Sequence, residues 1–321
     1  MKVLVTGAAG WLGRFLCPLL QARGHDVVGL DPVASAHTDV VGSVADDALV
    51  SALFQEHGFD AVVHAGALHK PDIARHPQRA FVDVNVQGTL NLLENACRTP
   101  GTRFVFTSTT SLMISQSIRD EDADTAVWLD ETHAPLEPRN IYGVTKLAAE
   151  GLCRQHHLQH GLDVVVLRTS RFFPEDDDTQ ATPSGPNLKA LELLHRRASV
   201  QDMARAHVAA VEHPGPIGFG LYLVSAPTPF AQVDLSALKT DAASVIRRHF
   251  PDVDDVFARA GWVLPSSVGR VYDGRRICRA LGFTYETTFA AVLQALRQGK
   301  PSPLVHDASY VSPLVSSATR P

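Results

Sequence analysis

A glycine-rich turn near the start of the chain narrows the choice of folds more than any other segment. The apolar run Lys2–Thr6 predicts a buried strand, and the segment Trp11–Arg23 has helical periodicity. Gly7, Gly10 and Gly13 stand between and within them. Glycines at this spacing permit a tight turn, a close approach of backbone to a ligand, and close packing of helix on strand. Strand, turn and helix in this order predict the first unit of a parallel sheet.

The alternation of strand and helix continues through the first half of the chain. Nearly every predicted strand is a continuous apolar run, as expected for parallel strands covered on both faces. The further strands are Asp26–Leu30, Ala61–His64, Arg103–Thr107 and Asp163–Arg168. The helices between them are Asp46–Glu56, Pro77–Cys97 and Ile141–His160. We therefore predict an α/β fold with a doubly wound parallel sheet.

Asp31 follows the second predicted strand and indicates which ligand the glycine turn binds. Backbone N–H groups at a helix start can hold a pyrophosphate. A carboxylate after the second strand can accept hydrogen bonds from a ribose 2′-OH and would repel a 2′-phosphate. No Lys or Arg follows Asp31 closely. The two features together predict NAD rather than NADP.

Tyr142 and Lys146 lie one turn apart on one face of the predicted helix Ile141–His160. A free Tyr titrates near pH ~10, too high for a base at neutral pH. A lysine ammonium within ~4–6 Å favours phenolate and lowers that pKa. Such a phenol could take a proton from an alcohol while a nicotinamide takes the hydride. The pair predicts an enzyme; a helix-surface pair without function is the alternative.

Composition argues against several other classes of protein. The 321 residues include 29 Lys and Arg and 34 Asp and Glu, a net charge of −5, which does not favour nucleic-acid or membrane-surface binding. No apolar run is long enough to span a bilayer, and the first residues do not resemble a signal peptide. The four cysteines are far apart and form no CxxC pair. We expect a cytoplasmic protein without disulfides.

We expect no metal site. His156 and His160 have the spacing of two metal ligands on one helix, but His157 stands where a zinc protease would need Glu. An exposed histidine face is the simpler interpretation.

Several segments together resemble one enzyme family. They are TGAAGWLG at the glycine turn, HAGALH at His64–His69, NVQGTLNLLENA from Asn85, FTSTTS at Phe106–Ser111, and YGVTK. The chain is similar to the extended short-chain dehydrogenase/reductases, which include NAD-dependent sugar-nucleotide epimerases and dehydratases. The resemblance runs from Met1 to about Arg168 and resumes at SVQDMARAHVAAVE and RVYDGRRICRALGF.

The resemblance implies a set of cofactor contacts beyond the three glycines and Asp31. It implies Trp11 and Leu12 at the pyrophosphate turn, Ser43 and Val44 under the adenine, Ala65, Gly66 and Ala67 beneath the nicotinamide ribose, and Asn85 as a brace beside that site. The family usually has Asp where Ser43 stands.

It also implies catalytic roles. Tyr142 would be the acid/base, and Lys146 would bind the nicotinamide ribose and lower the Tyr142 pKa. Thr109 falls where the epimerases carry a catalytic Ser, and a Thr hydroxyl can form the same hydrogen bond. Dehydratases carry Asp-Glu directly after the catalytic Thr, whereas this chain has Thr110 and Ser111. A 4,6-dehydratase is therefore not expected.

The substrate side is less well defined by the sequence. The expected substrate-binding residues are His69, Thr110, Arg171, Asn187 and Arg197, with Arg196 as the alternative to Arg197 for holding a diphosphate. The acidic run Glu175–Asp178 would repel a diphosphate unless it turned to solvent. It is either a solvated loop or a contact for a cationic substrate, such as an amino sugar or aminocyclitol.

These features suggest three regions. Residues 1–170 form the NAD-binding domain, to which residues 200–225 return; residues 171–199 and 226–300 form a smaller substrate lobe; and residues 301–321 are a Pro/Ser-rich tail. The second half has predicted helices at Leu188–Arg197, Val200–Glu212, Leu235–Phe250 and Phe289–Arg297, and a strand at Tyr222–Val224.

The predicted reaction is hydride transfer at a secondary hydroxyl of a sugar, sugar nucleotide or polyol. An epimerase is the first choice, a net dehydrogenase of a sugar or aminocyclitol the second, and a non-catalytic dinucleotide sensor the third. The resemblance also implies a homodimer.

Overall fold

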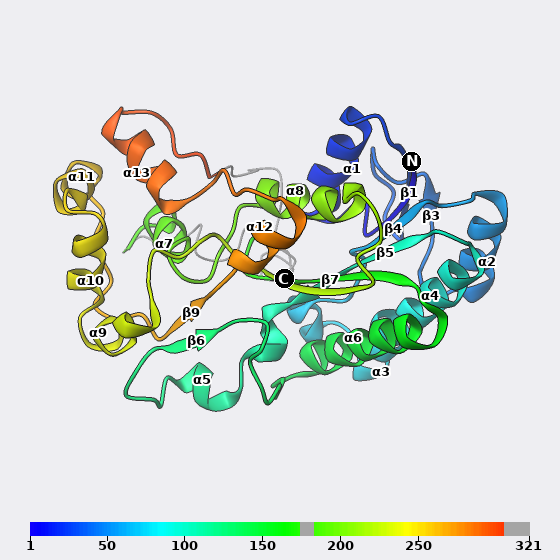
Figure 1. The fold of residues 1–321 in the computed structure, drawn as a ribbon, viewed down its shortest axis with the longest axis horizontal. Coiled ribbons are helices and arrows are strands. Elements are labelled where there is room, and N and C mark those ends of the chain that lie inside the picture. Colours follow the sequence, from blue (N-terminus) through cyan, green and yellow to red (C-terminus); the bar gives the residue numbers. More distant parts are fainter. Residues whose placement is uncertain (174–182, 305–321) are drawn as a thin grey trace, which may run out of the picture.

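The computed structural model describes residues 1–173 and 183–304, which contain a seven-stranded sheet in the order β3-β2-β1-β4-β5-β7-β8 (Figure 1). Every pair of neighbouring strands in it is parallel. The strands are β1 (Lys2–Thr6), β2 (Asp26–Asp31), β3 (Val40–Val41), β4 (Ala61–His64), β5 (Arg103–Thr109), β7 (Asp163–Thr169) and β8 (Phe219–Val224). The strand order reverses beside β1, so the prediction of a doubly wound parallel sheet is confirmed.

Helices cover both faces of this sheet. On one face α1 (Gly13–Ala22) packs beside α8 (Val200–Glu212), and on the other α2 (Asp47–Glu56), α4 (Gly88–Arg98) and α6 (Ile141–His160) lie in a row (Figure 1). Two separate apolar cores result, one on each face. The strand residues alternate between them: Val3 and Val5 belong to one core and Leu4 to the other. This explains the continuous apolar runs in the sequence.

The predicted helix Pro77–Cys97 is interrupted. The structure has α3 (Gln78–Phe81), a π-helical turn η2 (Val82–Gln87), and then α4. The Asn85 carbonyl oxygen in this turn accepts a bond from the Thr89 hydroxyl, at 2.6 Å. Such π-turns often occur at functional sites.

The predicted helix Leu235–Phe250 is also broken. It is divided into α9 (Leu235–Thr240) and α10 (Ala242–His249), because the Asp241 carboxylate accepts a bond from the Ser244 backbone N–H at 3.1 Å and begins a new helix. The predicted helix Leu188–Arg197 is placed earlier, as α7 (Gly185–Glu192).

The remaining elements form a smaller region beside the carboxyl end of the sheet (Figure 1). Strand β6 (Val127–Leu129) pairs in parallel with β9 (Arg270–Tyr272), far away in sequence. The other elements there are α5 (Gln116–Asp120), η5 (Gln232–Asp234), α11 (Val253–Ala260), α12 (Arg275–Leu281) and α13 (Phe289–Arg297). The short turns η1 (Lys70–Ala74) and η3 (Thr110–Met113) contact α6. The sequence did not predict β6 or β9. Because β6 pairs with β9, a segment from within residues 1–170 belongs to this second region.

None of the helices in residues 1–173 and 183–304 has the length and apolar character needed to cross a membrane. The four cysteines are all free thiols.

Candidate active site

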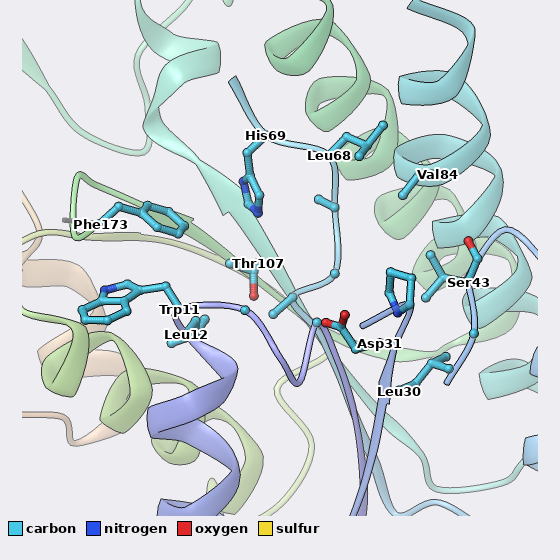
Figure 2. A pocket seen from close by; sticks show the side chains of 18 of the residues that line it. Trp11, Leu12, Leu30, Asp31, Ser43, Leu68, His69, Val84, Thr107 and Phe173 are labelled. Carbon is cyan, nitrogen blue, oxygen red and sulfur yellow. The ribbon is translucent and has the colours of Figure 1, made fainter. Parts of the chain in front are cut away.

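A cavity runs along the carboxyl ends of β1, β2 and β4 and reaches the segment after β7 (Figure 2). It is where the predicted cofactor residues meet, and most of them line it: Gly7, Gly10, Trp11, Leu12, Asp31, Ser43, Val44, Ala65, Gly66 and Ala67. A cavity at the point where strand order reverses is the expected place for a dinucleotide.

The glycine turn brings backbone, not side chains, to this cavity. Gly7 has a φ of +76°, and a Cβ on it would lie 2.7 Å from the backbone nitrogen of Gly66. A Cβ on Gly13 would lie 2.4 Å from the carbonyl oxygens of Gly7 and Ala8. Gly13 does not line the cavity; it allows α1 to pack closely on the turn. The tight turn at the start of α1 fits a pyrophosphate.

Asp31 lies at the end of β2, where a carboxylate can accept hydrogen bonds from the hydroxyl groups of a bound ribose. Its side chain lines the cavity, and its two oxygens accept bonds from the backbone N–H groups of Ala9 (3.1 Å) and Val33 (2.8 Å). Each carboxylate oxygen keeps a further lone pair for a ribose hydroxyl. Burial raises the pKa of Asp31, while these two hydrogen bonds lower it. The residues around the cavity therefore fit NAD.

The loop Ala65–His69 forms the opposite end of the cavity and is held at two points. The Gly66 backbone N–H donates to the Thr6 hydroxyl at 3.0 Å. The Asn85 side chain accepts from the Leu68 N–H at 2.8 Å and donates to the Leu68 carbonyl at 3.0 Å. Asn85 also donates to the Thr145 hydroxyl of α6 at 3.0 Å. Asn85 therefore braces the loop against α6 without lining the cavity itself.

His64 connects Thr6, which holds Gly66, with Thr89, whose hydroxyl bonds to the Asn85 carbonyl. Its Nδ1 lies 2.7 Å from the Thr6 hydroxyl and its Nε2 lies 3.0 Å from the Thr89 hydroxyl. The Thr89 proton is committed to the Asn85 carbonyl, so His64 carries its proton on Nε2 and Thr6 donates to Nδ1. Complete burial lowers the pKa of His64, consistent with this neutral form.

The three predicted catalytic residues come together beside this loop. Tyr142 and Thr109 are both buried, and the Thr109 side chain lies near enough to the phenol to act on its pKa. The Lys146 ammonium, one turn along α6, donates to the Thr107 carbonyl at 2.8 Å and lies 4.6 Å from the centroid of the Phe106 ring. The structure therefore brings a hydroxyl, a phenol and an amine together at the ends of β5 and α6.

The pKa values of these groups differ from the expectation. Burial raises the pKa of Tyr142 to about 12, although the Thr109 side chain acts to lower it. Burial lowers the pKa of Lys146 to about 7. The prediction that Lys146 depresses the Tyr142 pKa is therefore not met in this structure. The physical reason is that burial disfavours the charged form of both groups.

His69 and Thr110 lie beside the catalytic residues. The His69 ring lines the cavity, with its centroid 5.6 Å from that of Tyr142 and 5.4 Å from that of Phe173 (Figure 2). Desolvation, and secondarily the charge of Lys146, lower the His69 pKa to about 3, so the ring is neutral. Thr110 is buried and begins η3. Their roles toward substrate stay predictions.

The other expected substrate residues have internal partners. Three arginines surround the buried Glu192 carboxylate: Arg171 at 2.8 Å, Arg196 at 2.7 Å and Arg197 at 2.7 Å. They hold the Glu192 pKa at about 2, against the effect of burial.

Asn187 is likewise engaged with neighbouring backbone. Its side chain donates to the Val263 carbonyl and accepts from the Val263 N–H. A substrate role for Asn187, Arg171 and Arg197 stays a prediction, and the contacts in this structure stabilise the lobe itself. The acidic run Glu175–Asp178 lies outside the described residues.

The sequence did not predict several cavity residues. They are Leu30, Pro32, Gly42, Leu68, Val84, Thr107, Phe172 and Phe173. Phe172 and Phe173 follow β7, so the rule that ligands bind at the carboxyl ends of parallel strands could have found them. The Trp11 indole N–H donates to the Phe172 carbonyl at 3.1 Å, joining the glycine turn to this segment.

His156 on α6 is buried, so the expectation of an exposed histidine face is wrong for this residue. The His156 and His160 rings lie 5.7 Å apart, and His156 Nδ1 lies 2.9 Å from the Leu152 carbonyl. Within the described ranges, no group of three or more His, Cys, Asp or Glu side chains could hold a metal ion.

Comparison with known proteins shows several similar enzymes. The chain is 31% identical over 284 residues to dTDP-glucose 4,6-dehydratase from Streptomyces antibioticus, covering 76% of this chain and 78% of that protein. It is 31% identical to UDP-glucose 4-epimerase from Rhizobium meliloti (52% and 50% covered). It is 32% identical to L-arabinose 1-dehydrogenase from Haloferax volcanii (55% and 69% covered). The chain thus spans about half the length of some of its relatives.

Solved structures share the fold. The UDP-glucose 4-epimerase of Thermus thermophilus, in complex with NAD, superimposes with a TM-score of 0.61 at 22% identity, covering 92% of this chain and 99% of that one. The model of the NAD dependent epimerase/dehydratase family matches residues 3–219. With the cavity described above, these matches show that the chain belongs to the NAD-dependent epimerase/dehydratase family, within the extended short-chain dehydrogenase/reductases.

Proposed function

We propose that this NAD-dependent enzyme acts on a secondary hydroxyl of a sugar nucleotide or related sugar, with Tyr142 as the acid/base. The observation that carries the proposal is that Tyr142, Thr109 and Lys146 are buried together at the end of β5, with the Tyr142 ring against His69, whose ring lines the cavity. Bound NAD supplies the acceptor and donor of hydride.

Each residue of the group has a separate part in the proton transfer. Tyr142 takes the proton of the substrate hydroxyl as a phenolate and returns it as a phenol. The Thr109 side chain favours the phenolate, since it acts to lower the Tyr142 pKa. Lys146 is anchored on the Thr107 carbonyl, and in this proposal it binds the ribose of the nicotinamide. Burial of the group keeps water away from the reacting atoms.

The net reaction we propose is epimerisation. The family includes dehydratases and epimerases, and Thr110 and Ser111 stand where dehydratases carry the Asp-Glu pair, so the groups for water elimination are absent from those two positions. A net sugar dehydrogenase is the second candidate, favoured by the similarity to L-arabinose 1-dehydrogenase.

A substrate screen separates these candidates. Sugar nucleotides, free sugars and aminocyclitols would be incubated with the enzyme and NAD, and followed by NADH absorbance and product NMR. An epimerised product without net NADH supports the first candidate, and stoichiometric NADH supports the second. Failure of every substrate to react, with NAD bound, would favour the sensor class.

We also propose that the enzyme is a cytoplasmic homodimer. Val82 of η2 and Val144 and Leu158 of α6 are large apolar side chains with exposed fractions of 45%, 48% and 69%. They occur on two neighbouring elements, and pairing with a second copy would bury them. Sedimentation analysis of the wild type and of Val144→Asp tests this: the wild type should be dimeric and the variant monomeric.

A further inference from the structure

Thr107, near the end of β5, is a cavity residue that the motifs did not single out. Its side chain lies in the cavity below His69 (Figure 2). Both of its polar groups have partners on other elements. The carbonyl accepts from Lys146 of α6 at 2.8 Å, and the hydroxyl lies 2.8 Å from Nε2 of His207 on α8.

The second ring nitrogen of His207 decides the direction of this hydrogen bond. Nδ1 lies 2.7 Å from the Met203 carbonyl, which can only accept, so Nδ1 carries a proton. His207 is completely buried, and burial lowers its pKa to about 4. The ring is therefore neutral near pH 7, and Nε2 has a lone pair. It follows that Thr107 donates its hydroxyl proton to His207.

Because the Thr107 hydroxyl donates to His207, it can only accept a hydrogen bond from a ligand. Its proton is used inside the protein, so only oxygen lone pairs remain for the cavity. A ligand group beside it must be a hydrogen-bond donor. Thr107 carries the carbonyl that anchors Lys146, the residue expected to bind the nicotinamide ribose, and its side chain lies below His69, so we place it at the half of the dinucleotide that does not carry the adenine (Figure 2).

We propose that Thr107 binds the nicotinamide half of NAD by accepting a hydrogen bond from a ribose hydroxyl or from the carboxamide N–H. His207 is its positioning residue, because it orients the hydroxyl. This inference rests on the assignment of NAD as cofactor and adds a contact and an orientation to it.

Calorimetric titration with NAD and with ADP tests the contact. Thr107→Val removes the hydroxyl and keeps the shape, so the Kd for NAD should rise about fivefold, the value expected for one hydrogen bond. Thr107→Ser keeps the hydroxyl and should bind NAD as the wild type does. ADP lacks the nicotinamide half, so its Kd should not change in any variant. Thr107→Ala serves as the hydroxyl-free variant if the Val protein does not fold.

Two variants of His207 test the orientation. His207→Leu offers no acceptor and should weaken NAD binding two- to fivefold in the wild-type background, but not further in the Thr107→Val background. His207→Gln offers an oxygen near the position of Nε2 and should restore most of the affinity. An effect of His207→Leu that is the same in both backgrounds would mean that His207 has only a structural role and would overturn the orientation.

A cofactor analogue identifies the donor. In 3-acetylpyridine adenine dinucleotide the carboxamide N–H is absent. If the Thr107→Val penalty disappears with this analogue, the partner is the carboxamide; if it persists, the partner is the ribose hydroxyl. An unchanged Kd for NAD in Thr107→Val, or an equal loss for ADP, would overturn the proposal. Failure of the wild type to bind NAD would instead overturn the cofactor assignment on which it rests.

Discussion

The cofactor side of this enzyme and the lobe that we expect to bind substrate, called the substrate side below, are built from different kinds of contact. On the cofactor side, glycines and backbone groups approach closely, as where Gly7 meets Gly66. On the substrate side, charged side chains satisfy one another, as where three arginines surround Glu192. Backbone approach leaves a local signal in the sequence, because only Gly fits. Pairing between side chains leaves no such signal in the sequence. The sequence does not distinguish an arginine that binds a ligand from one that pairs with a neighbouring carboxylate.

The catalytic group should show the largest effect. Tyr142→Phe should reduce kcat/KM by about 10²–10⁴-fold, because the acid/base is lost. The Kd for NAD should stay within about twofold, since Tyr142 does not line the cofactor cavity. Tyr222→Phe, a tyrosine on β8, is the matched control. Comparable rates for Tyr142→Phe and Tyr222→Phe would reject Tyr142 as the base.

Glu192 tests the idea that the substrate side is held by its own charges. Glu192→Gln should lower the free energy of unfolding by about 3–5 kcal/mol, since it removes the carboxylate charge that faces the buried Arg197 and its two arginine neighbours. In the wild type the Glu192 pKa falls from 4.5 to about 2 on folding. A depressed pKa stabilises the fold above pH 4.5, and this stabilisation is lost as pH falls toward 2.

The free energy of unfolding, measured with denaturant at several pH values between about 2 and 4.5, checks this prediction. The wild type should lose stability on acidification more steeply than Glu192→Gln. Equal slopes, or a variant as stable as the wild type at neutral pH, would show that the cluster does not hold the lobe.

Gly13 tests the close approach of backbone groups at the glycine turn on the cofactor side. Gly13→Ala should raise the Kd for NAD at least tenfold and destabilise the fold by about 1–3 kcal/mol, because its Cβ would lie 2.4 Å from backbone oxygens. Gly151→Ala is the control, since no atom lies within 4 Å of its added Cβ. That change should leave NAD binding unaltered and stabilise α6 by about 0.5–1 kcal/mol. Equal behaviour of the two variants would contradict the close approach.

His69 lies where the two sides meet and should give the smallest effect. His69→Phe keeps the ring contacts with Tyr142 and Phe173 but removes the polar nitrogens. We expect the KM for substrate to rise about threefold to tenfold, from the loss of one hydrogen bond. Because His69 also lines the cavity assigned to NAD, the Kd for NAD should change as well, but by less than the KM for substrate. A change in NAD affinity with a constant KM would place His69 on the cofactor side.

The sequence predicted the sheet and many of the residues that line the cavity, because both follow from local patterns. Apolar runs define the buried strands, and Gly7 and Asp31 occupy places fixed by strand ends. The interruption at η2 could not be predicted, because a π-turn differs from an α-helix by its hydrogen-bond pattern and not by its residue types. Even Asn85, implied by resemblance, gave no indication that the helix widens around it.

Other features depend on contacts between distant segments. The orientation of the Thr107 hydroxyl requires His207 on α8, and no spacing in the sequence connects the two. The pairing of β6 with β9 also could not be predicted. Each strand has only three residues, too few to give a strand pattern in the sequence, and each is a strand only because it pairs with the other. The pKa of Tyr142 also could not be predicted, because it depends on how completely the structure buries the phenol.

The pairing of Val127–Leu129 with Arg270–Tyr272 has a consequence for synthesis of the protein. A ribosome adds roughly 5–20 residues per second, so the earlier strand emerges many seconds before its partner exists. During that interval its backbone groups are unpaired, although several strands of the large sheet are already available. The nascent chain therefore passes through a stage in which much of the large sheet can form while the region that contains β6 and β9 cannot.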